Sequence, residues 1–151
     1  MKNTARLAKG LCGAAVAIGM ASAPWAGESG TAKIVHGDVR VERAGTSLPL
    51  AVGDAVMEKD RIVVPAGASA GITLRDDTRI SVGPRSTLVI NGFAFDTKTH
   101  EGLVDTSILS GTMRYVTGLV GRLNRNAVRV ATATATIGIR GTDFIVEVAE
   151  Q

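Results

Sequence analysis

Two histidines and a few carboxylates are the side chains of this chain best suited to acid–base chemistry or metal binding. His36 lies beside a Gly37-Asp38 turn signal and His100 lies in a polar stretch, so we expect both at the surface rather than in a catalytic pocket. Asp76 and Asp77 are adjacent, and adjacent side chains on a strand point to opposite faces. We therefore expect this pair at a hairpin tip, where aspartate tolerates a left-handed backbone, and not around a metal ion.

Other carboxylates and serines also lack the spacing that catalysis or metal binding requires. Asp54, Glu58 and Asp60 are close together but lack the glycine and the final glutamate of a calcium loop. We expect no serine in the Gly-x-Ser-x-Gly context of a nucleophile elbow, and there is no His-Glu-x-x-His or Cys/His metal spacing. The sequence therefore predicts a protein that is not an enzyme and that has no catalytic residue, cofactor or metal site.

One part of the chain carries five arginines and no acidic residue. Between Thr106 and Thr142 the arginines are Arg114, Arg122, Arg125, Arg129 and Arg140. A guanidinium group binds carboxylates and phosphates in a forked geometry. One interpretation is that Arg114, Arg129 and Arg140 bind an anionic ligand or an acidic partner. The other is that the arginines are solvated and paired with acids from the first half of the chain.

Short strands are the elements that must position these residues. Apolar and polar residues alternate over stretches such as 39–42, 48–52 and 70–74, and turn signals recur roughly every 8–12 residues. We expect a single all-β domain of many short strands in a rolled or β-helix-like sheet, with a β-sandwich as the alternative. Residues 119–126 are too short for a stable helix and are interrupted by a glycine, so we expect a loop that includes one helical turn at most.

Several segments indicate where the strands end. Asn91-Gly92 is a strong hairpin signal, Ser110-Gly111 predicts a turn, and residues 96–102 predict a polar loop. Strict Ala/Thr alternation over residues 131–136 predicts one strand whose alanine face packs closely against another layer. The row of threonines on the other face is also compatible with an ice-binding ladder. The glycines that flank Arg140 mark a bend after this strand.

The first 26 residues have the layout of a secretory signal peptide. Three basic residues precede an uncharged, largely apolar stretch over residues 11–23, and small residues follow. We expect cleavage after Ala26, which leaves residues 27–151 as the mature β domain of an exported, periplasmic or extracellular protein. The alternative is an uncleaved segment that tethers the protein to the inner membrane.

Removal of this segment leaves a domain with no net charge. Residues 1–26 hold three of the 17 basic residues and none of the 14 acidic ones, so the remainder carries 14 of each sign. A nucleic-acid-binding domain is expected to be strongly basic, so we do not expect nucleic acid as a partner. The one cysteine, Cys12, lies in the same segment, so we expect the mature domain to fold without a disulfide.

Four segments, in this order along the chain, resemble the FecR domain family. Residues 52–56 (Val-Gly-Asp-Ala-Val) resemble its early Gly-Asp turn, and residues 70–84 resemble its central hairpin, with Asp77 in place of the usual glycine. Residues 109–114 (Leu-Ser-Gly-Thr-Met-Arg) are similar to its Leu-x-Gly-x-x-Arg strand start. Residues 130–144, which end in Ile-Arg-Gly-Thr-Asp-Phe, are similar to its closing motif.

This resemblance implies a mainly β domain that senses or binds a ligand or partner in the cell envelope. It also implies a structural role for the closing-motif residues Gly138, Arg140, Gly141 and Thr142. Transcription regulators that resemble this family also have a cytoplasmic segment that binds a sigma factor and a membrane span. We expect neither in this chain, which begins with a signal peptide and ends at Gln151. We therefore expect an exported, non-enzymatic binding module, with a structural or assembly component of the envelope as the alternative.

Overall fold

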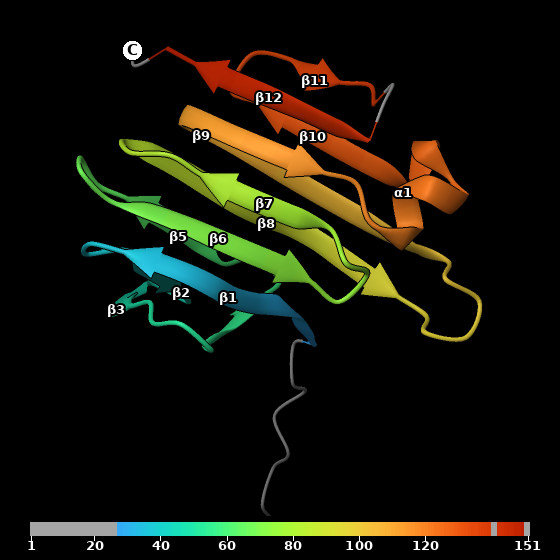
Figure 1. Cartoon of the computed structure of the whole chain (residues 1–151), viewed down its shortest axis with the longest axis horizontal. Coiled ribbons are helices and arrows are strands. Elements are labelled where there is room, and N and C mark those ends of the chain that lie inside the picture. The colour runs from blue at the N-terminus through green and yellow to red at the C-terminus, as the bar shows by residue number, and fades with distance from the viewer. Residues whose placement is uncertain (1–26, 140–141, 150–151) are drawn as a thin grey trace, which may run out of the picture.

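The computed structural model describes residues 27–139 and 142–149, and their fold is all β apart from two short helical turns (Figure 1). The strands are β1 (Glu28–His36), β2 (Arg40–Arg43), β3 (Thr46–Pro49), β4 (Ala55–Met57), β5 (Arg61–Val64), β6 (Ser69–Leu74), β7 (Arg79–Val82), β8 (Ser86–Phe95), β9 (Gly102–Val116), β10 (Val128–Thr132), β11 (Thr136–Ile137) and β12 (Asp143–Val148). The helix α1 (Leu119–Leu123) and the 3-10 turn η1 (Arg125–Ala127) lie between β9 and β10, where one helical turn was expected. The expected signal peptide, Arg140 and Gly141 lie outside the described residues.

The twelve strands form one curled sheet that folds over into two facing layers, so the expected rolled all-β sheet is confirmed. In the front layer of Figure 1 the strand order is β12-β9-β7-β6-β1-β4, and in the back layer it is β11-β10-β9-β8-β5-β2-β3. Neighbouring strands are antiparallel except β9 and β10, which run parallel. Strand β9 belongs to both layers, because its first part pairs with β8 and β10 and its last part pairs with β7 and β12.

Alternation along the strands builds an apolar core between the two layers. Every second residue of β6 is buried, which turns Ile72 and Leu74 inward, and Ile62 of β5 and Ile90 of β8 are buried in the facing layer. Full burial of an aliphatic side chain of this size contributes about 1.5–3 kcal/mol. Because the chain has a single cysteine and so no internal disulfide, this core is the main source of its stability.

Tyr115 of β9 is a fully buried tyrosine of this core, and its ring stacks on Phe144 of β12 with the centroids 5.2 Å apart. Its hydroxyl has no hydrogen-bond partner of acceptable geometry among the described residues. The nearby Thr78 hydroxyl instead donates to Asp76 and accepts from the Gly118 amide. Burial raises the pKa of Tyr115 above its usual value, the Thr78 side chain offsets part of this rise, and the Asp76 carboxylate adds to it.

The pKa shift of Tyr115 predicts a loss of stability in alkali. The folded protein holds the proton of the Tyr115 hydroxyl more tightly than the unfolded chain does. The free energy of unfolding is therefore unaffected by ionisation of this group below pH 10.0 and decreases as the pH rises above that value. Tyr115→Phe should stay within about 1 kcal/mol of the wild type near neutral pH and should lose less stability than the wild type in alkali. Urea titrations on both sides of pH 10.0 check this, and parallel losses in the two proteins would contradict it.

The expected hairpin at Asn91-Gly92 is wrong. Strand β8 continues through this dipeptide, and its pairing with β9 shifts register there, so Asn91 is the extra residue of a β-bulge. The Asn91 side chain donates from Nδ2 to Asp105 Oδ1 (3.0 Å) and to Ser107 Oγ (2.7 Å) on β9. These bonds keep the dipeptide within the sheet, and the chain reverses in the polar loop expected near residues 96–101.

The expectation of a turn at Ser110-Gly111 is also wrong. Strand β9 continues through these two residues and passes there from the back layer to the front layer. Gly111 has a φ of +79° and lies against the start of β8. Ser86 Oγ accepts a hydrogen bond from the Thr112 amide at 2.9 Å. A Cβ at position 111 would overlap Ser86 Oγ and lie 2.7 Å from Arg85 O. Glycine is therefore required for the bend that lets one strand serve both layers.

The Ala/Thr stretch forms a hairpin and not the single strand that its alternation predicts. Strand β10 ends at Thr132, residues 133–135 turn, and β11 pairs back onto β10. The Thr132 hydroxyl accepts from the Ala135 amide at 3.0 Å, and the turn residues are exposed. The expectation of a tightly packed alanine face is therefore wrong, and the threonines do not form one straight row.

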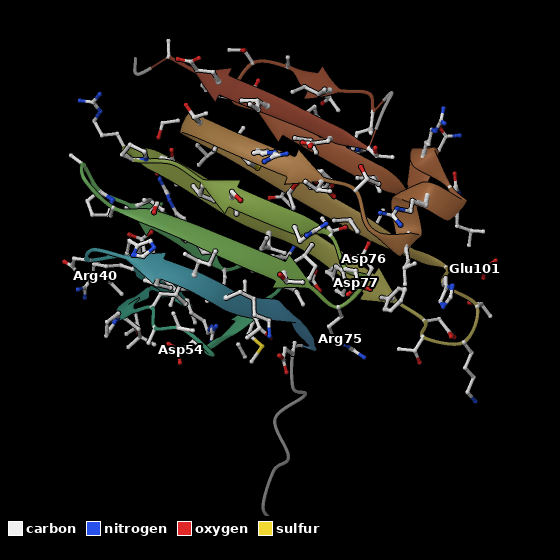
Figure 2. The ribbon with its side chains drawn as sticks, in the orientation of Figure 1. Arg40, Asp54, Arg75, Asp76, Asp77 and Glu101 are labelled. Atoms are coloured by element: carbon white, nitrogen blue, oxygen red, sulfur yellow. The ribbon has the colours of Figure 1, made fainter. Side chains whose placement is uncertain are left out.

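Asp76 and Asp77 form the tip of the β6–β7 hairpin, as expected (Figure 2). Asp77 has a φ of +64°, the left-handed conformation in which glycine is common. Asp76 is fully buried, and its carboxylate accepts from the amide (3.1 Å) and the hydroxyl (2.8 Å) of Thr78. Thr78 Oγ1 accepts from the Gly118 amide at 3.0 Å, so the tip is bound to the start of α1. Both aspartates therefore have structural roles.

A buried ion pair closes the end of the two layers at which β3 and β4 lie. Asp60, which lies between β4 and β5, is fully buried, and Arg43 at the end of β2 donates to its carboxylate from Nε (2.7 Å) and Nη2 (2.6 Å). The same carboxylate accepts from the Met57 amide at 2.8 Å, and Arg43 also donates to Ala55 O at 2.9 Å. The hydrogen bond to Asp60 raises the pKa of Arg43, although burial opposes the rise. The pair links β4 of the front layer to β2 and β5 of the back layer.

Candidate functional site

The opposite end of the two layers has no such clamp among the described residues. Its edge strands are β12 in the front layer and the two-residue β11 in the back layer, at the red end of the colours in Figure 1. Residues 136–139 lie between two shallow hollows, one beside β12 and one beside Arg125 and Arg129. We call β11, β12 and residues 136–139 together the open end.

The hollow beside the arginines joins two cations to an apolar wall. It measures about 380 Å³, with Arg125 and Arg129 on one side and Val128, Ile137 and Ile139 supplying apolar surface. Neither arginine forms an ion pair with a carboxylate of the described residues, whereas the five ion pairs found there involve other cations. We call this feature the arginine hollow.

Local structure explains why these two arginines face solvent. Asn124 Oδ1 accepts from the Asn126 amide at 3.0 Å, which caps the η1 turn that carries Arg125. Arg129 alternates along β10 with the buried residues Val128 and Val130, so its side chain points away from the core. Two guanidinium groups without a carboxylate partner, next to apolar surface, suit a carboxylate or phosphate that is attached to an apolar group.

Of the three arginines that the sequence suggested as an anion site, the structure describes Arg114 and Arg129, which lie on different layers. Arg114 lies on the outer face of the front layer, where Nε and Nη2 donate to the Asp143 carboxylate at 3.0 and 2.5 Å. These hydrogen bonds lower the pKa of Asp143 and raise that of Arg114. Arg129 lies on the outer face of the back layer, and Arg140 lies outside the described residues. Binding of an anionic partner by these three residues stays a prediction.

The alternative interpretation, pairing with acids of the first half of the chain, is not observed for the described arginines of this run. The acid that binds Arg114 comes from β12, and Arg122, Arg125 and Arg129 form no ion pair within the part of the chain that the structure describes. Arg129 is the register partner of Asp105 on β9, but the Asp105 carboxylate accepts from Asn91 instead.

The closing motif is described in part. Gly138 is exposed, and a Cβ there would meet nothing within 4 Å, so close packing does not require glycine at this position. Thr142 O accepts from the Thr117 amide at 2.7 Å, which begins the pairing of β12 with β9. Arg140 and Gly141 lie outside the described residues, and the structural role implied for the motif stays a prediction.

The histidines lie at the surface, as expected. His36 is exposed and lies opposite Ser69 in the pairing of β1 with β6. Ser69 is the central residue of the sequence Gly67-Ala68-Ser69-Ala70-Gly71. This sequence fits Gly-x-Ser-x-Gly, so the expectation that no serine has this context is wrong. Ser69 nevertheless begins a strand and not the helix that follows a nucleophile elbow. His100 is exposed and stacks on Phe95 with the ring centroids 6.1 Å apart. Within the described residues, no group of three or more His, Cys, Asp or Glu side chains could hold a metal ion.

Sequence reasoning missed two features of this molecule. Arg125 was counted in the acid-free run but was not chosen as a site residue, and only its position beside Arg129 in the fold distinguishes it. Asp60 was grouped with Asp54 and Glu58, whereas its partner Arg43 lies 17 residues earlier in the chain. In both cases the feature depends on residues that come together only in the folded protein, so the spacing of residues along the sequence does not reveal it.

Comparison with known proteins identifies the family of the C-terminal part of the chain. A family model described as FecR protein matches residues 60–151, which is more than half of the chain and includes the arginine hollow and β12. No curated protein and no solved structure matches the chain at a significant level. None of the helices in residues 27–139 and 142–149 is long and apolar enough to cross a membrane.

Proposed function

The chain belongs to the FecR protein family, and we propose that it is an exported, non-enzymatic module that binds a partner in the periplasm or at the cell surface. Membership of this family implies a role in envelope signalling or sensing. The layout of residues 1–26 supports export, and the position of Ser69 at the start of a strand, rather than before the helix of a nucleophile elbow, supports binding rather than catalysis. We propose a binding module and not a complete sigma-factor regulator.

The observation that carries this proposal is the arginine hollow. Arg125 and Arg129 line the same concave surface, and neither forms an ion pair with a carboxylate of the described residues. A partner that presents a carboxylate or phosphate beside an apolar group would gain forked hydrogen bonds to the arginines. The same partner would cover Ile137 and Ile139. The proposed ligand is therefore an anionic group on an apolar segment of a partner.

Removal of both arginines is the test of this function. The exported protein is purified from a periplasmic extract, its first residue, expected to be Gly27, is read by mass spectrometry, and co-purifying proteins are identified. Hydrogen bonds to charged groups contribute about 1.5–3 kcal/mol each, so Arg125→Ala/Arg129→Ala should weaken partner binding at least about tenfold at unchanged melting temperature.

The matched control removes two positive charges elsewhere. Lys33 on β1 and Arg75 beside the β6–β7 tip are exposed and form no ion pair among the described residues, so Lys33→Ala/Arg75→Ala should bind like the wild type. Equal loss in both double variants would indicate general attraction by net charge. Recovery of no partner above background, with no thermal shift on adding candidate anions, would remove the support for a binding module.

A further inference from the structure

The two layers have four edge strands, and three of them are poor templates for another strand. Strand β3 has four residues and ends in Pro49, β4 has three residues and β11 has two. Short edges and proline are the usual protection of a sheet against further pairing. Strand β12 differs, because it has six residues, contains neither proline nor lysine, and exposes 68% of Ile145.

The free backbone groups of β12 can be assigned to particular residues. Thr142 O accepts from the Thr117 amide, so the even-numbered residues of β12 direct their backbone groups toward β9. Backbone direction alternates along an antiparallel strand, so Asp143, Ile145 and Glu147 direct theirs away from β9. None of the described strands pairs with that side. Three residues therefore present amides and carbonyls along one open edge.

An apolar hollow runs beside this edge. It measures about 440 Å³ and is lined by Ile137 and Ile139 from the back layer and by Phe144 and Val146 from β12. Every second side chain of a strand added to β12 would point toward the space between the two layers, where this hollow lies. The hollow thus accepts the apolar side chains of such a strand, and the edge accepts its backbone.

Charge identifies the kind of strand that fits. Asp143 is bound by Arg114, whereas Glu147 is exposed and has no ion pair among the described residues. A second copy of β12 paired antiparallel in the register centred on Ile145 would place Ile145 opposite Ile145 and each Asp143 opposite a Glu147. Like charges in directly opposed positions destabilise a strand pair. A basic side chain opposite Glu147 would instead form a cross-strand ion pair.

We propose that the outer edge of β12 binds an extended segment of a partner protein, which adds a strand to the front layer. The segment has apolar residues at alternate positions, which enter the hollow beside β12, and a lysine or arginine opposite Glu147. This mode of recognition combines main-chain hydrogen bonds for affinity with side-chain pockets for specificity. It goes beyond the arginine hollow, which lies on the other side of residues 136–139 and is not required for it.

Proline at position 145 tests the proposal without breaking the pairing of β12 with β9. The Ile145 amide points to the open edge, so Ile145→Pro removes one free donor and leaves the hydrogen bonds to β9 in place. Ile145→Thr is the matched control, because it also removes exposed apolar surface but keeps the amide. The probe is a displayed library of random peptides of about 12 residues, long enough to span a strand.

The expected result has three parts. Selected peptides should alternate apolar residues and carry a basic residue, and they should bind Ile145→Pro at least about tenfold more weakly than the wild type, as expected for the loss of a backbone hydrogen bond and a steric block. Ile145→Thr should bind within about threefold of the wild type. In the wild-type protein, peptide binding should slow amide exchange at Ile145 and Glu147, whose amides pair with no strand among the described residues.

Four outcomes would overturn the proposal. If no peptide binds, or if peptides bind Ile145→Pro as tightly as the wild type, the edge of β12 is not the site. Protection that appears at residues 137–139 and not at positions 145 and 147 would place the ligand in the arginine hollow. A dimer in light scattering that Ile145→Pro dissociates would identify the occupant as a second copy of this chain. Loss of binding in Arg125→Ala/Arg129→Ala alone tests the proposed function and leaves this site untouched.

Discussion

Replacement of Asp60 with asparagine is expected to lower the free energy of unfolding by about 3 kcal/mol, at the lower end of the range for breaking a buried ion pair. The carboxylate is fully buried and accepts three hydrogen bonds, two from Arg43 and one from the Met57 amide. Asparagine has the same shape, but its NH₂ group cannot accept, so at least one of these donors loses its partner. The lower end applies because 35% of the Arg43 side chain is exposed and water can solvate part of its charge.

An exposed ion pair on the same layer provides the control. Arg61 and Glu42 face each other on β5 and β2 at 3.6 Å, and about half of each side chain is exposed. Glu42→Gln should therefore change stability by less than about 1 kcal/mol in the same urea titration. If Asp60→Asn costs no more than Glu42→Gln, the ion pair does not hold the two layers together at this end.

Local sequence patterns predicted the strands because alternation of side chains is a local property. The alternation that marks Ile72 and Leu74 as buried is read directly from neighbouring residues, and the Asp76-Asp77 tip follows from the conformations that aspartate tolerates. Folding into two layers is not local. It depends on Gly111, where β9 changes layers, and a glycine of that kind looks like a turn in the sequence.

Two of the wrong expectations share one cause. The dipeptide Asn91-Gly92 has a strong turn preference, but the Asn91 side chain donates hydrogen bonds to Asp105 and Ser107, which lie 14 and 16 residues later. The alternation of residues 131–136 is that of a strand, yet Thr132 accepts from the Ala135 amide and reverses the chain. In each case a hydrogen bond that the pattern does not encode outweighs a propensity of about 1 kcal/mol or less.

The candidate site could be located by sequence only to a region. The acid-free run includes Arg125 and Arg129, the arginines of the proposed site, but it does not distinguish them from Arg114, which Asp143 binds. Which arginines remain without a carboxylate partner depends on strand register. The same holds for β12, because its exposed edge follows from the strand order and not from its composition.

Gly111→Ala is the other substitution with a large expected effect, a loss of about 3 kcal/mol in the free energy of unfolding from two separate sources. Alanine at a φ of +79° is strained by about 1–2 kcal/mol. Its Cβ would also overlap Ser86 Oγ and lie 2.7 Å from Arg85 O, and crowding of a packed site costs about 1–3 kcal/mol. The clash lies where β9 connects the two layers, so a separation of β8 from β9 would disturb the packing of both layers.

Two other glycines separate the strain from the crowding. Gly45, in the turn between β2 and β3, has the same φ of +79° but nothing within 4 Å of an added Cβ, so Gly45→Ala should cost only the strain, about 1–2 kcal/mol. Gly138 also has open space and lacks the positive φ, so Gly138→Ala should change stability by less than about 0.5 kcal/mol. Urea titrations of the three variants should therefore rank position 111 above 45 and 45 above 138. A Gly111→Ala loss no greater than that of Gly45→Ala would mean that β8 yields at Ser86, and that the join between the layers is looser than the packing around Gly111 implies.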